Sequence, residues 1–507
     1  MSKKVSFHEK ATAKIMTGME IASNAVIGTI GPKGKNVYFE DKYTPTITND
    51  GATIASKIIL KDKEEDVGAY LIRNVSAQQN DDVGDGTTTV VALTQAIIKE
   101  AIKRPENPNV VKESLNQAKQ GIIDKLEQRK VTIPIEEIEK VTLISTENAK
   151  LATLIAEIVQ KLGTNAHVAV EDATGFETTS EIVEGYETKH GFMSPHFADK
   201  KTGQAILEDV AVLVSEKKIS NLIDIKPLLD KLGEAQMGSC VIVCDDIEES
   251  ILGVLVANKA MGRFQSIVIR ASGDDLKDIA GSVGATIVSP ETGVTLAKIE
   301  LSHLGHAKKV VCDAHKTLFI GEPGVAKEYA DELERSEPYE ENMFRKERLR
   351  LRVAELRGGV GIIKVGASSD FEREYLKLKA QDGIKATLAA LEEGVVEGGG
   401  MTLWRIAQEM TGETCGEEVL KRALTAPLKA IIANTGEDYG EIIRNMPADQ
   451  GYNAKTNKIE NLIEAGVIDP KKVERCAVEN AISAASTFIT IFATITEEDE
   501  IPRNNNT

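Results

Sequence analysis

The central part of the chain has an alternating pattern that restricts the fold more than any other feature. From about residue 205 onward, short β-branched runs such as SCVIVCDD and FQSIVIRAS alternate with helical stretches such as IKPLLDKLGEA. Strands that alternate with helices indicate βαβ units and a mainly parallel sheet. A charged segment, 324–357, follows and is expected to form a solvated helix. The pattern predicts an α/β domain in the middle of the chain.

Both ends of the chain have a different pattern, typical of amphipathic helices that are rich in alanine and poor in aromatic side chains. The predicted helical segments are residues 10–30, 87–128, 383–445 and 471–495. At 507 residues the chain is too long for one core, and its length suggests about three domains. We therefore expect a multidomain α and α/β protein in which an α/β insert interrupts a helical domain built from both ends.

Composition argues against several classes of protein. A formal net charge of −18 disfavours a nucleic-acid-binding protein, which normally has a basic face. No apolar run is long enough to span a membrane, and the start of the chain lacks the features of a signal or transit peptide. The five cysteines form no disulfide framework, which indicates a reducing, cytoplasmic setting. Neither a membrane nor a nucleic acid is expected as a partner.

The stretch GDGTTT, residues 84–89, places a carboxylate between two glycines and before three threonines at the start of an apolar helical segment. A helix N-terminus has unpaired N–H groups and a positive dipole end, which attract phosphate. Asp85 would repel a phosphate unless a Mg²⁺ bridged the two groups. Two interpretations stay open at this point: a phosphate-and-magnesium loop, or a helix start with more capping side chains than it needs.

Two other stretches carry weaker signals. GTIGPKGKN (28–36) ends the first long helix, but it is not a Walker A loop, because Thr29 and Asn36 replace the Gly and Ser/Thr of that pattern. TITNDGATIA (46–55) is interpreted as two strands joined by a hairpin turn at its Asn-Asp-Gly. A nucleotide site in this region would have to be of another kind than a P-loop.

A run of three glycines lies in LEEGVVEGGGMTLW, residues 391–404. One helix is predicted to end at Gly394 and another to begin after the glycines. A tight corner between helices needs fewer glycines, so the run suggests close approach of the backbone to a ligand. Asp382 is expected to open the preceding helix, where it would cap that helix or act as a general base.

A possible metal site is suggested by HLGHAKKVVCDAH, which contains His303, His306, Cys312 and His315. KKVVCDAHKTLFI is interpreted as one strand, on which Cys312 and His315 point to opposite faces. This spacing disfavours a metal site.

In this order along the chain, the motifs resemble those of the group I chaperonins, the bacterial GroEL type of the 60 kDa chaperonin family. The stretches that carry the resemblance are TIGPKG, NDGATIA, GDGTTT, VEG…GFMSPHF, GGVGIIKVGA, LEEGVVEGGG and GYNA…VIDP. The resemblance covers essentially the whole chain and implies a chaperonin fold of three domains. Their expected boundaries are 1–128 and 393–507 for a helical equatorial domain, 129–184 and 361–392 for a small α+β intermediate domain, and 185–360 for an inserted α/β apical domain.

The resemblance also implies an ATP hydrolase that uses Mg²⁺ and K⁺. Asp382 matches the catalytic carboxylate, Asp50 matches an acid that faces the attacking water, and Asp85 matches the magnesium ligand. The residues that match the nucleotide-binding positions are Thr29, Ile30, Gly31, Pro32, Asp85, Gly86, Thr87, Thr88, Thr89, Gly399, Asn453, Ala454 and Asp469. The residues that match the apical groove for unfolded chains and the co-chaperonin are Phe192, Phe197, Leu229, Leu252 and Val256.

The implied function is ATP-dependent capture and folding of unfolded proteins in a ring-shaped cage. Seven-membered rings, stacked in pairs, and a separate small lid co-chaperonin are expected, because no insertion is long enough for a built-in lid. Three positions depart from the family pattern. Asn49 replaces the usual Lys, and His196 and Lys226 replace an aromatic and an aliphatic groove residue.

Two other classes of function were weighed against the chaperonin. A nucleotide-insensitive chaperonin-like scaffold is disfavoured because both Asp85 and Asp382 are present. A small-molecule kinase or metabolic ATPase is disfavoured because the chain has no Walker A loop and carries two apolar helices in its α/β insert.

Overall fold

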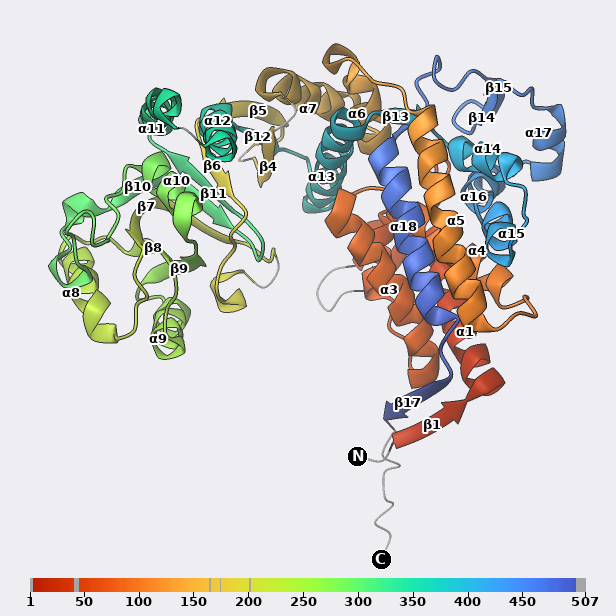
Figure 1. Cartoon of the computed structure of the whole chain (residues 1–507), viewed down its shortest axis with the longest axis horizontal. Helices are drawn as coiled ribbons and strands as arrows, with labels where there is room; N and C mark the ends of the chain where they lie inside the picture. Colours follow the sequence, from red (N-terminus) through yellow and green to blue (C-terminus); the bar gives the residue numbers. More distant parts are fainter. Residues whose placement is uncertain are drawn as a thin grey trace, which may run out of the picture. The chain divides into compact units, whose positions relative to one another are not determined.

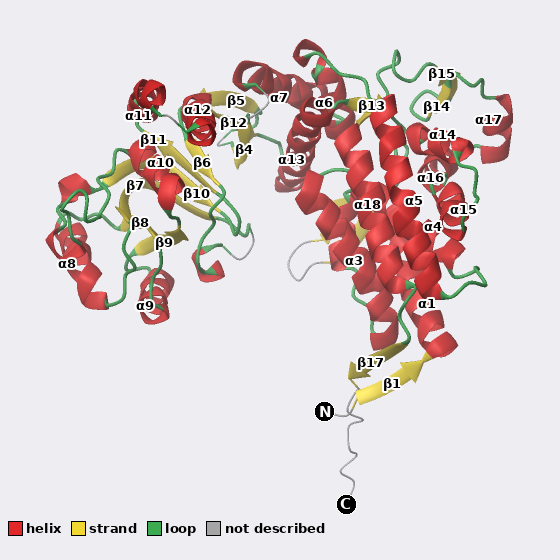
Figure 2. Cartoon of the chain, in the orientation of Figure 1, coloured by secondary structure: helices red, strands yellow, loops and turns green. Residues whose placement is uncertain are grey.

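The computed structural model describes residues 3–40, 45–163, 166–173, 175–199, 202–340 and 342–497. The chain forms two compact units, one mainly helical and one with a large sheet (Figures 1 and 2). Unit 1 comprises Met1–Gln160, Val170–Thr179 and Lys364–Thr507, and unit 2 comprises Lys161–Ala169 and Ser180–Ile363. The predicted arrangement of an α/β insert within a helical domain built from both chain ends is confirmed.

Unit 1 has a core of long helices. Its helices are α1 (His8–Ile27), α2 (Gly51–Lys57), α3 (Lys63–Val83), α4 (Thr87–Ala101), α5 (Pro108–Arg129), α6 (Glu139–Thr146), α7 (Ala149–Leu162, which runs into unit 2), α13 (Asp370–Glu393), α14 (Met401–Glu409), α15 (Cys415–Ala423), α16 (Ala426–Thr435), α17 (Tyr439–Asn445) and α18 (Lys471–Phe488). One hydrophobic cluster joins the buried faces of α1, α3, α4, α5, α15 and α18. None of the described helices has both the length and the apolar character of a membrane span.

Helices α1 and α3 cross in close contact because each carries a glycine at the crossing point. A Cβ atom on Gly18 would lie 1.8 Å from the carbonyl oxygen of Glu65. A Cβ atom on Gly68 would lie 1.9 Å from the carbonyl oxygen of Ile15. Any larger residue at either position would therefore push the two helices apart.

Four small antiparallel sheets complete unit 1. They pair β1 (Lys3–Phe7) with β17 (Ala493–Glu497), β2 (Val37–Glu40) with β3 (Pro45–Thr48), β13 (Val395–Glu397) with β16 (Ile468–Pro470), and β14 (Gly451–Asn453) with β15 (Lys458–Glu460). The first described strand of the chain thus pairs with the last one, from Lys3 opposite Glu497 to Phe7 opposite Ala493.

Unit 2 is built on a six-stranded sheet with the order β6-β11-β10-β7-β8-β9. Its strands are β6 (Tyr186–Thr188), β7 (Ala205–Ser215), β8 (Ser239–Cys244), β9 (Gln265–Arg270), β10 (Gly305–Cys312) and β11 (Thr317–Gly321). Its helices are α8 (Leu222–Glu234), α9 (Glu249–Ala260), α10 (Gly273–Val283), α11 (Val325–Ser336) and α12 (Met343–Gly358). Strands β7, β8 and β9 are parallel, as the βαβ pattern predicts, and the other pairings are antiparallel.

The chain passes between the two units within strands β4 (His167–Asp172), β5 (Thr179–Val183) and β12 (Val360–Val365), which form a three-stranded sheet. The predicted division into equatorial, intermediate and apical domains is finer than the two units, and it stays a prediction.

Two predicted helices are broken in the structure. The segment 87–128 forms α4 and α5 rather than one helix, because Pro105 and Pro108 interrupt it and the Asn107 side chain accepts a hydrogen bond from the Asn109 N–H at the start of α5. The charged segment 324–357 forms α11 and α12, with a break at the 3-10 turn Glu337–Tyr339. In addition, the predicted helix 471–495 ends at Phe488 and the chain continues into β17.

Two strand predictions are also wrong. Residues 46–55 are not a hairpin, because β3 ends at Thr48 and α2 begins at Gly51. KKVVCDAHKTLFI is a hairpin of β10 and β11 rather than one strand, since the Asp313 carboxylate accepts hydrogen bonds from the N–H groups of His315 and Lys316 at the turn (2.7 and 2.9 Å). The argument from opposite strand faces therefore no longer applies, and among the described residues no group of three or more His, Cys, Asp or Glu is placed to hold a metal ion.

Candidate functional site

The GDGTTT stretch forms the link between α3 and α4. Gly84 ends α3 and Gly86 precedes α4, both with left-handed backbone (φ 68° and 74°) that favours glycine. None of the four side chains that could cap α4 does so; they are Asp85, Thr87, Thr88 and Thr89. The N–H groups of its first turn therefore stay available to a ligand, which favours the phosphate-loop interpretation over the capping one.

The Asp85 carboxylate accepts two hydrogen bonds, one from its own loop and one from helix α6. One carboxylate oxygen accepts from the Gly86 N–H (2.6 Å), and the other accepts from the Ser145 hydroxyl on α6 (3.0 Å). The side chain is thus fixed beside the open start of α4. Ser145 was not predicted, because nothing in the local sequence of α6 relates it to residue 85.

Asp50 caps helix α2 instead of lying in a hairpin turn. Its carboxylate accepts a hydrogen bond from the Thr53 N–H (2.7 Å). The next residue contacts the start of α4, since a Cβ atom on Gly51 would lie 2.5 Å from the Thr88 hydroxyl oxygen and 2.8 Å from that of Thr87. The start of α2 and the start of α4 therefore meet, and Asp50 lies beside the threonines of the predicted phosphate loop.

Asp382 lies inside α13. The prediction that it opens a helix is wrong. The helix begins at Asp370, where the Ser369 hydroxyl accepts a hydrogen bond from the Glu372 N–H (3.2 Å). Burial raises the pKa of the Asp382 carboxyl well above its usual range, and the nearby charges of Asp50 and Asp85 raise it further. The three carboxylates that the sequence singled out, from three distant segments, are thus close enough to act on one another.

The three glycines lie between β13 and α14, and two of them are explained by contacts within the protein. A Cβ atom on Gly398 would lie 3.0 Å from a carboxylate oxygen of Asp469, and one on Gly400 would lie 2.7 Å from the Leu428 nitrogen. Gly399 has an open environment, and its N–H donates to Asp469 (3.1 Å). Contacts within the protein thus explain Gly398 and Gly400, and a role for Gly399 beside a ligand stays a prediction.

The remaining predicted nucleotide residues lie around one small hydrophobic cluster of unit 1. Ile30 and Ala454 both belong to this cluster, together with Tyr452 and Leu428. The Asn453 side chain is held in its hairpin, where it donates to Glu460 (2.7 Å). The loop 28–34 and the hairpin around residue 453 are thus brought beside Gly399.

The same loop carries the predicted Thr29, Gly31 and Pro32. The Thr29 hydroxyl donates to the Val26 carbonyl (2.8 Å), and Gly31 has φ 79°. Asn434 on α16 donates to the Ile30 carbonyl (2.9 Å), which fixes the loop to the helix.

Sequence reasoning missed a further carboxylate, Glu474 on α18. It is buried with Asp469 and Asp85 as its acidic neighbours, and burial raises the pKa of both Glu474 and Asp469. One signal could have found it. Glu474 shares a helix face with the buried residues Ala477, Val478 and Ala481, and an acid on an apolar stripe is unusual.

The residues present fit a magnesium nucleotide. Two buried oxygens, Asn49 Oδ1 and Glu474 Oε2, have no hydrogen-bond partner in the described structure. Carboxylate oxygens are the ligands that Mg²⁺ prefers, and the ion usually takes one or two of them together with phosphate oxygens. Asp85 is the carboxylate at the α4 start and would hold the ion there, whereas the helix N–H groups would hold the phosphates.

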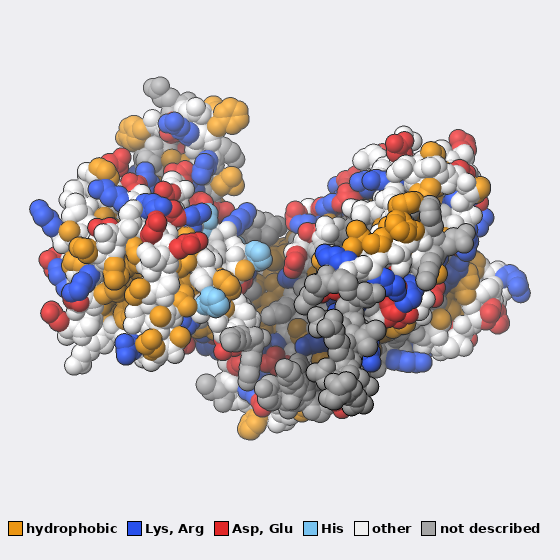
Figure 3. Space-filling model, turned by 90° about the horizontal axis from the view of Figure 1, so that it is seen from below, with side chains coloured by type: hydrophobic (Ala, Val, Ile, Leu, Met, Phe, Trp, Pro, Cys, Tyr) orange, Lys and Arg blue, Asp and Glu red, His pale blue; other side chains and the backbone are white. Residues whose placement is uncertain are grey.

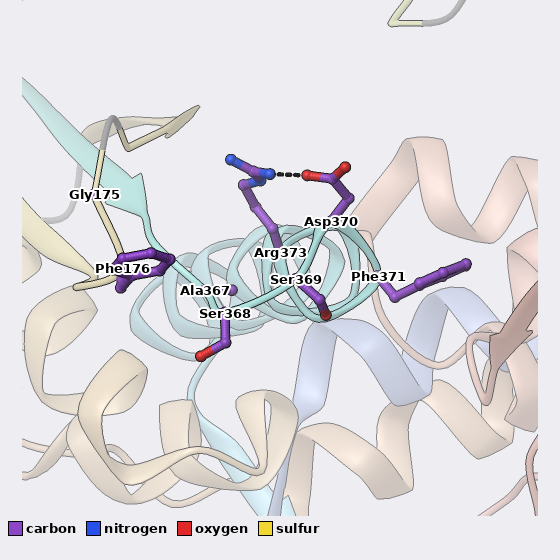
Figure 4. A pocket seen from close by; sticks show the side chains of 8 residues that line it. All are labelled: Gly175, Phe176, Ala367, Ser368, Ser369, Asp370, Phe371 and Arg373. Atoms are coloured by element: carbon purple, nitrogen blue, oxygen red, sulfur yellow. Dashed lines mark hydrogen bonds and ion pairs between the residues drawn. The ribbon is translucent and has the colours of Figure 1, made fainter.

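A separate pocket of about 490 Å³ lies at the start of α13 (Figure 4). It is lined by Phe176 and Phe371, which are both exposed, and by the ion pair of Arg373 with Asp370. It lies several helical turns before Asp382 on α13 and contains none of the predicted site residues. The pocket is therefore not the nucleotide site.

The predicted apical groove residues are only partly exposed. Leu229, Leu252 and Val256 are half-buried and pack against the core of unit 2, as does Phe192. Phe197 is fully buried (0% exposed), so in this conformation it presents no surface to a partner. Its aromatic ring lies in the hydrophobic core, where an apolar residue is most stable.

Helices α8 and α9 nevertheless carry exposed apolar side chains. Ile223 is 72% exposed and Val254 is 37% exposed, with Met261 just after α9 at 62%. Hydrophobic side chains lie among charged ones on the face shown in Figure 3. Lys226 on α8 is exposed and pairs with Asp230 (2.7 Å). The surface of these helices is therefore mixed rather than uniformly apolar.

Comparison with known proteins places this geometry in a family. The model of the TCP-1/cpn60 chaperonin family matches residues 22–499. Two similar solved structures are crystal forms of the chaperonin gp146 from the bacteriophage EL 2 (Pseudomonas aeruginosa), both determined in the presence of ATP-BeFx. Crystal form II is 19% identical and gives a TM-score of 0.70, and crystal form I is 20% identical and gives 0.65.

In both cases the match covers 97% of this chain and 99% of the phage protein, so the fold is shared along the whole length. The resemblance that the motifs indicated is confirmed. The chain belongs to the TCP-1/cpn60 chaperonin family.

Proposed function

We propose that the protein is an ATP-driven chaperonin that captures unfolded proteins and promotes their folding. The observation that carries the proposal is the convergence of Asp50, Asp85 and Asp382 at the uncapped start of α4. Three carboxylates that lie close together repel one another, and a scaffold that does not bind nucleotide would gain nothing from keeping them there.

Each residue has a definite task in this site. The first-turn N–H groups of α4 and the Thr87–Thr89 hydroxyls bind the phosphates, and Asp85 holds the Mg²⁺. A Mg²⁺ held there by Asp85 would supply the charge neutralisation that phosphate transfer needs. Asp382 accepts the proton of the attacking water, which Asp50 helps to orient. Asp469, whose carboxylate accepts a hydrogen bond from the Gly399 N–H, contacts the ribose of the nucleotide.

The phage chaperonin supports a nucleotide at this fold, since its structures were determined in the presence of ATP-BeFx. K⁺ is included in the proposal by family resemblance. The other features that we propose on the same ground are an intermediate hinge domain, seven-membered rings stacked in pairs, and a separate lid co-chaperonin. ATP would act by shifting a two-state hinge through its different affinity for the two states.

Client capture is proposed for the surface of α8 and α9. Exposed apolar side chains on these helices provide the contact area, and unfolded chains provide apolar segments to match. Lys226 makes this surface more polar than the family pattern. We therefore propose weaker binding of strongly hydrophobic clients and a greater dependence on salt.

The alternative functions are tested by one comparison. Negative-stain electron microscopy of the purified protein, combined with ATP hydrolysis by the same sample, is expected to show stacked rings and steady phosphate release. Rings without hydrolysis would favour the nucleotide-insensitive scaffold. Hydrolysis by a monomer that phosphorylates a small molecule would favour the kinase.

A further inference from the structure

Glu474 is a buried carboxylate that the nucleotide mechanism above does not use. It is 5% exposed, and its Oε2 has no hydrogen-bond partner among the described residues. The basic residues around it on α18 are engaged elsewhere: Lys471 pairs with Glu393 (3.2 Å), Lys472 with Glu392, and Arg475 with Glu479 (2.7 Å). An ionised carboxylate buried with an open oxygen is costly, so such a group stays protonated unless a cation or a hydrogen-bond donor compensates its charge.

The start of α18 is fixed to the predicted phosphate loop. The Gln79 side-chain amide donates both to the Asp85 carbonyl (3.0 Å) and to the Val473 carbonyl (3.2 Å). A Cβ atom on Gly86 would lie 2.6 Å from a methyl group of Val473. Glu474 follows Val473 directly, and the charges that act on it are those of Asp469 and Asp85. It therefore lies next to the loop that would hold the cation.

We propose that Glu474 positions the Mg²⁺ that accompanies ATP, by contacting the water shell of the ion beside Asp85. This inference rests on the proposed nucleotide site. Mg²⁺ is usually bound through one or two carboxylates together with substrate phosphates, so Asp85 would need no second direct ligand from the protein. Mg²⁺ usually keeps several of its waters, and a carboxylate one water away is a common partner for it.

The test is calorimetric titration of Glu474→Gln with ATP, once with Mg²⁺ and once with EDTA. The change keeps the shape of the side chain and removes its charge. We expect Mg·ATP to bind about 10- to 100-fold more weakly, as for other outer-shell partners of a metal. Metal-free ATP is expected to bind at least as tightly as to wild type, because one charge that repels the phosphates is lost.

Two further variants separate this role from a structural one. Glu474→Asp keeps the charge and is expected to retain most of the Mg²⁺ dependence. Glu479→Gln is the matched control on the same helix, since its carboxylate pairs with Arg475 (2.7 Å), and it should bind nucleotide as wild type does. Nucleotide-free Glu474→Gln is expected to melt at or above the wild-type temperature, since Gln is neutral at every pH and replaces a buried carboxyl group that is costly to ionise.

The outcomes are distinct. An unchanged Mg²⁺ dependence in Glu474→Gln, or equal weakening of ATP binding with and without the ion, would overturn the role of Glu474 alone. A lowered melting temperature with weaker binding in both titrations would assign Glu474 to structure. Failure of the wild-type protein to bind Mg·ATP would overturn the proposed function and this inference together.

Discussion

Replacing Asp382 gives the sharpest test of the mechanism. The structure records no hydrogen bond to its carboxylate within the described ranges, so a substitution there breaks no contact that holds α13 in place. A general base contributes about 10²- to 10⁴-fold to a rate. At 1.36 kcal/mol for each factor of ten, Asp382→Ala should raise the barrier to hydrolysis by about 3–5 kcal/mol.

The pH dependence follows from the raised pKa of Asp382. A general base works when ionised, so phosphate release by the wild type should increase as pH rises through this pKa, and Asp382→Ala should lose that dependence. The folded state binds this proton more tightly than the unfolded chain. Stability is therefore lost as pH rises from the unfolded pKa, about 3.9, toward the folded one. Nucleotide-free Asp382→Asn should melt at or above the wild-type temperature at neutral pH.

The assays are single-turnover phosphate release and calorimetric ATP binding. Asp382→Ala should bind ATP nearly as wild type does and hydrolyse it very slowly. Glu374→Ala is the matched control on the same helix, because its side chain is 68% exposed and its carboxylate pairs with Lys377 on the same helix (3.3 Å). The reasoning would be refuted if Asp382→Ala released phosphate at a rate within about threefold of wild type, because loss of a general base should slow the reaction far more than that.

Five other substitutions test three separate parts of the molecule. Asp85→Asn keeps one acceptor oxygen for the Gly86 N–H and an amide group that can donate to the Ser145 hydroxyl, but it should weaken Mg·ATP binding strongly in calorimetry. An unchanged, still magnesium-dependent affinity would place the ion elsewhere. Leu252→Ser or Val256→Ser should abolish suppression of client aggregation and leave basal ATPase intact, whereas Lys226→Leu should tighten client binding. Gly18→Ala should lower the free energy of unfolding by about 1–3 kcal/mol in urea titrations, and an unchanged midpoint would mean that α1 and α3 separate freely.

Short-range sequence patterns predicted the secondary structure that neighbouring residues determine. The alternation of β-branched runs and helical stretches gave β7, β8 and β9 as a parallel set, and the glycine after Glu393 marked the end of α13. The breaks at Pro105 and Pro338 could also have been predicted from the sequence, because proline beyond the first turn removes a helical hydrogen bond and clashes with the preceding turn.

The candidate site could not be assembled from such patterns. Asp50, Asp85 and Asp382 come from α2, the α3–α4 link and α13, and only tertiary packing brings them together. Asp50 was assigned to a turn because Asn-Asp-Gly favours a hairpin and an N-cap alike. Family resemblance supplied the roles of these residues, whereas Glu474, outside that pattern, became visible only from its burial.

The pairing of β1 with β17 sets the order in which the newly made chain can fold. The ribosome delivers residues 3–7 first, but their partner strand, 493–497, lies at the other end of the described chain. The core of the helical unit also needs α18, which is synthesised just before that strand. Almost all of the α/β unit, in contrast, comes from one stretch, Ser180–Ile363. Domains generally fold as units during synthesis. The inserted unit can therefore fold on the ribosome while the flanking helices wait for α18 and β17 to emerge.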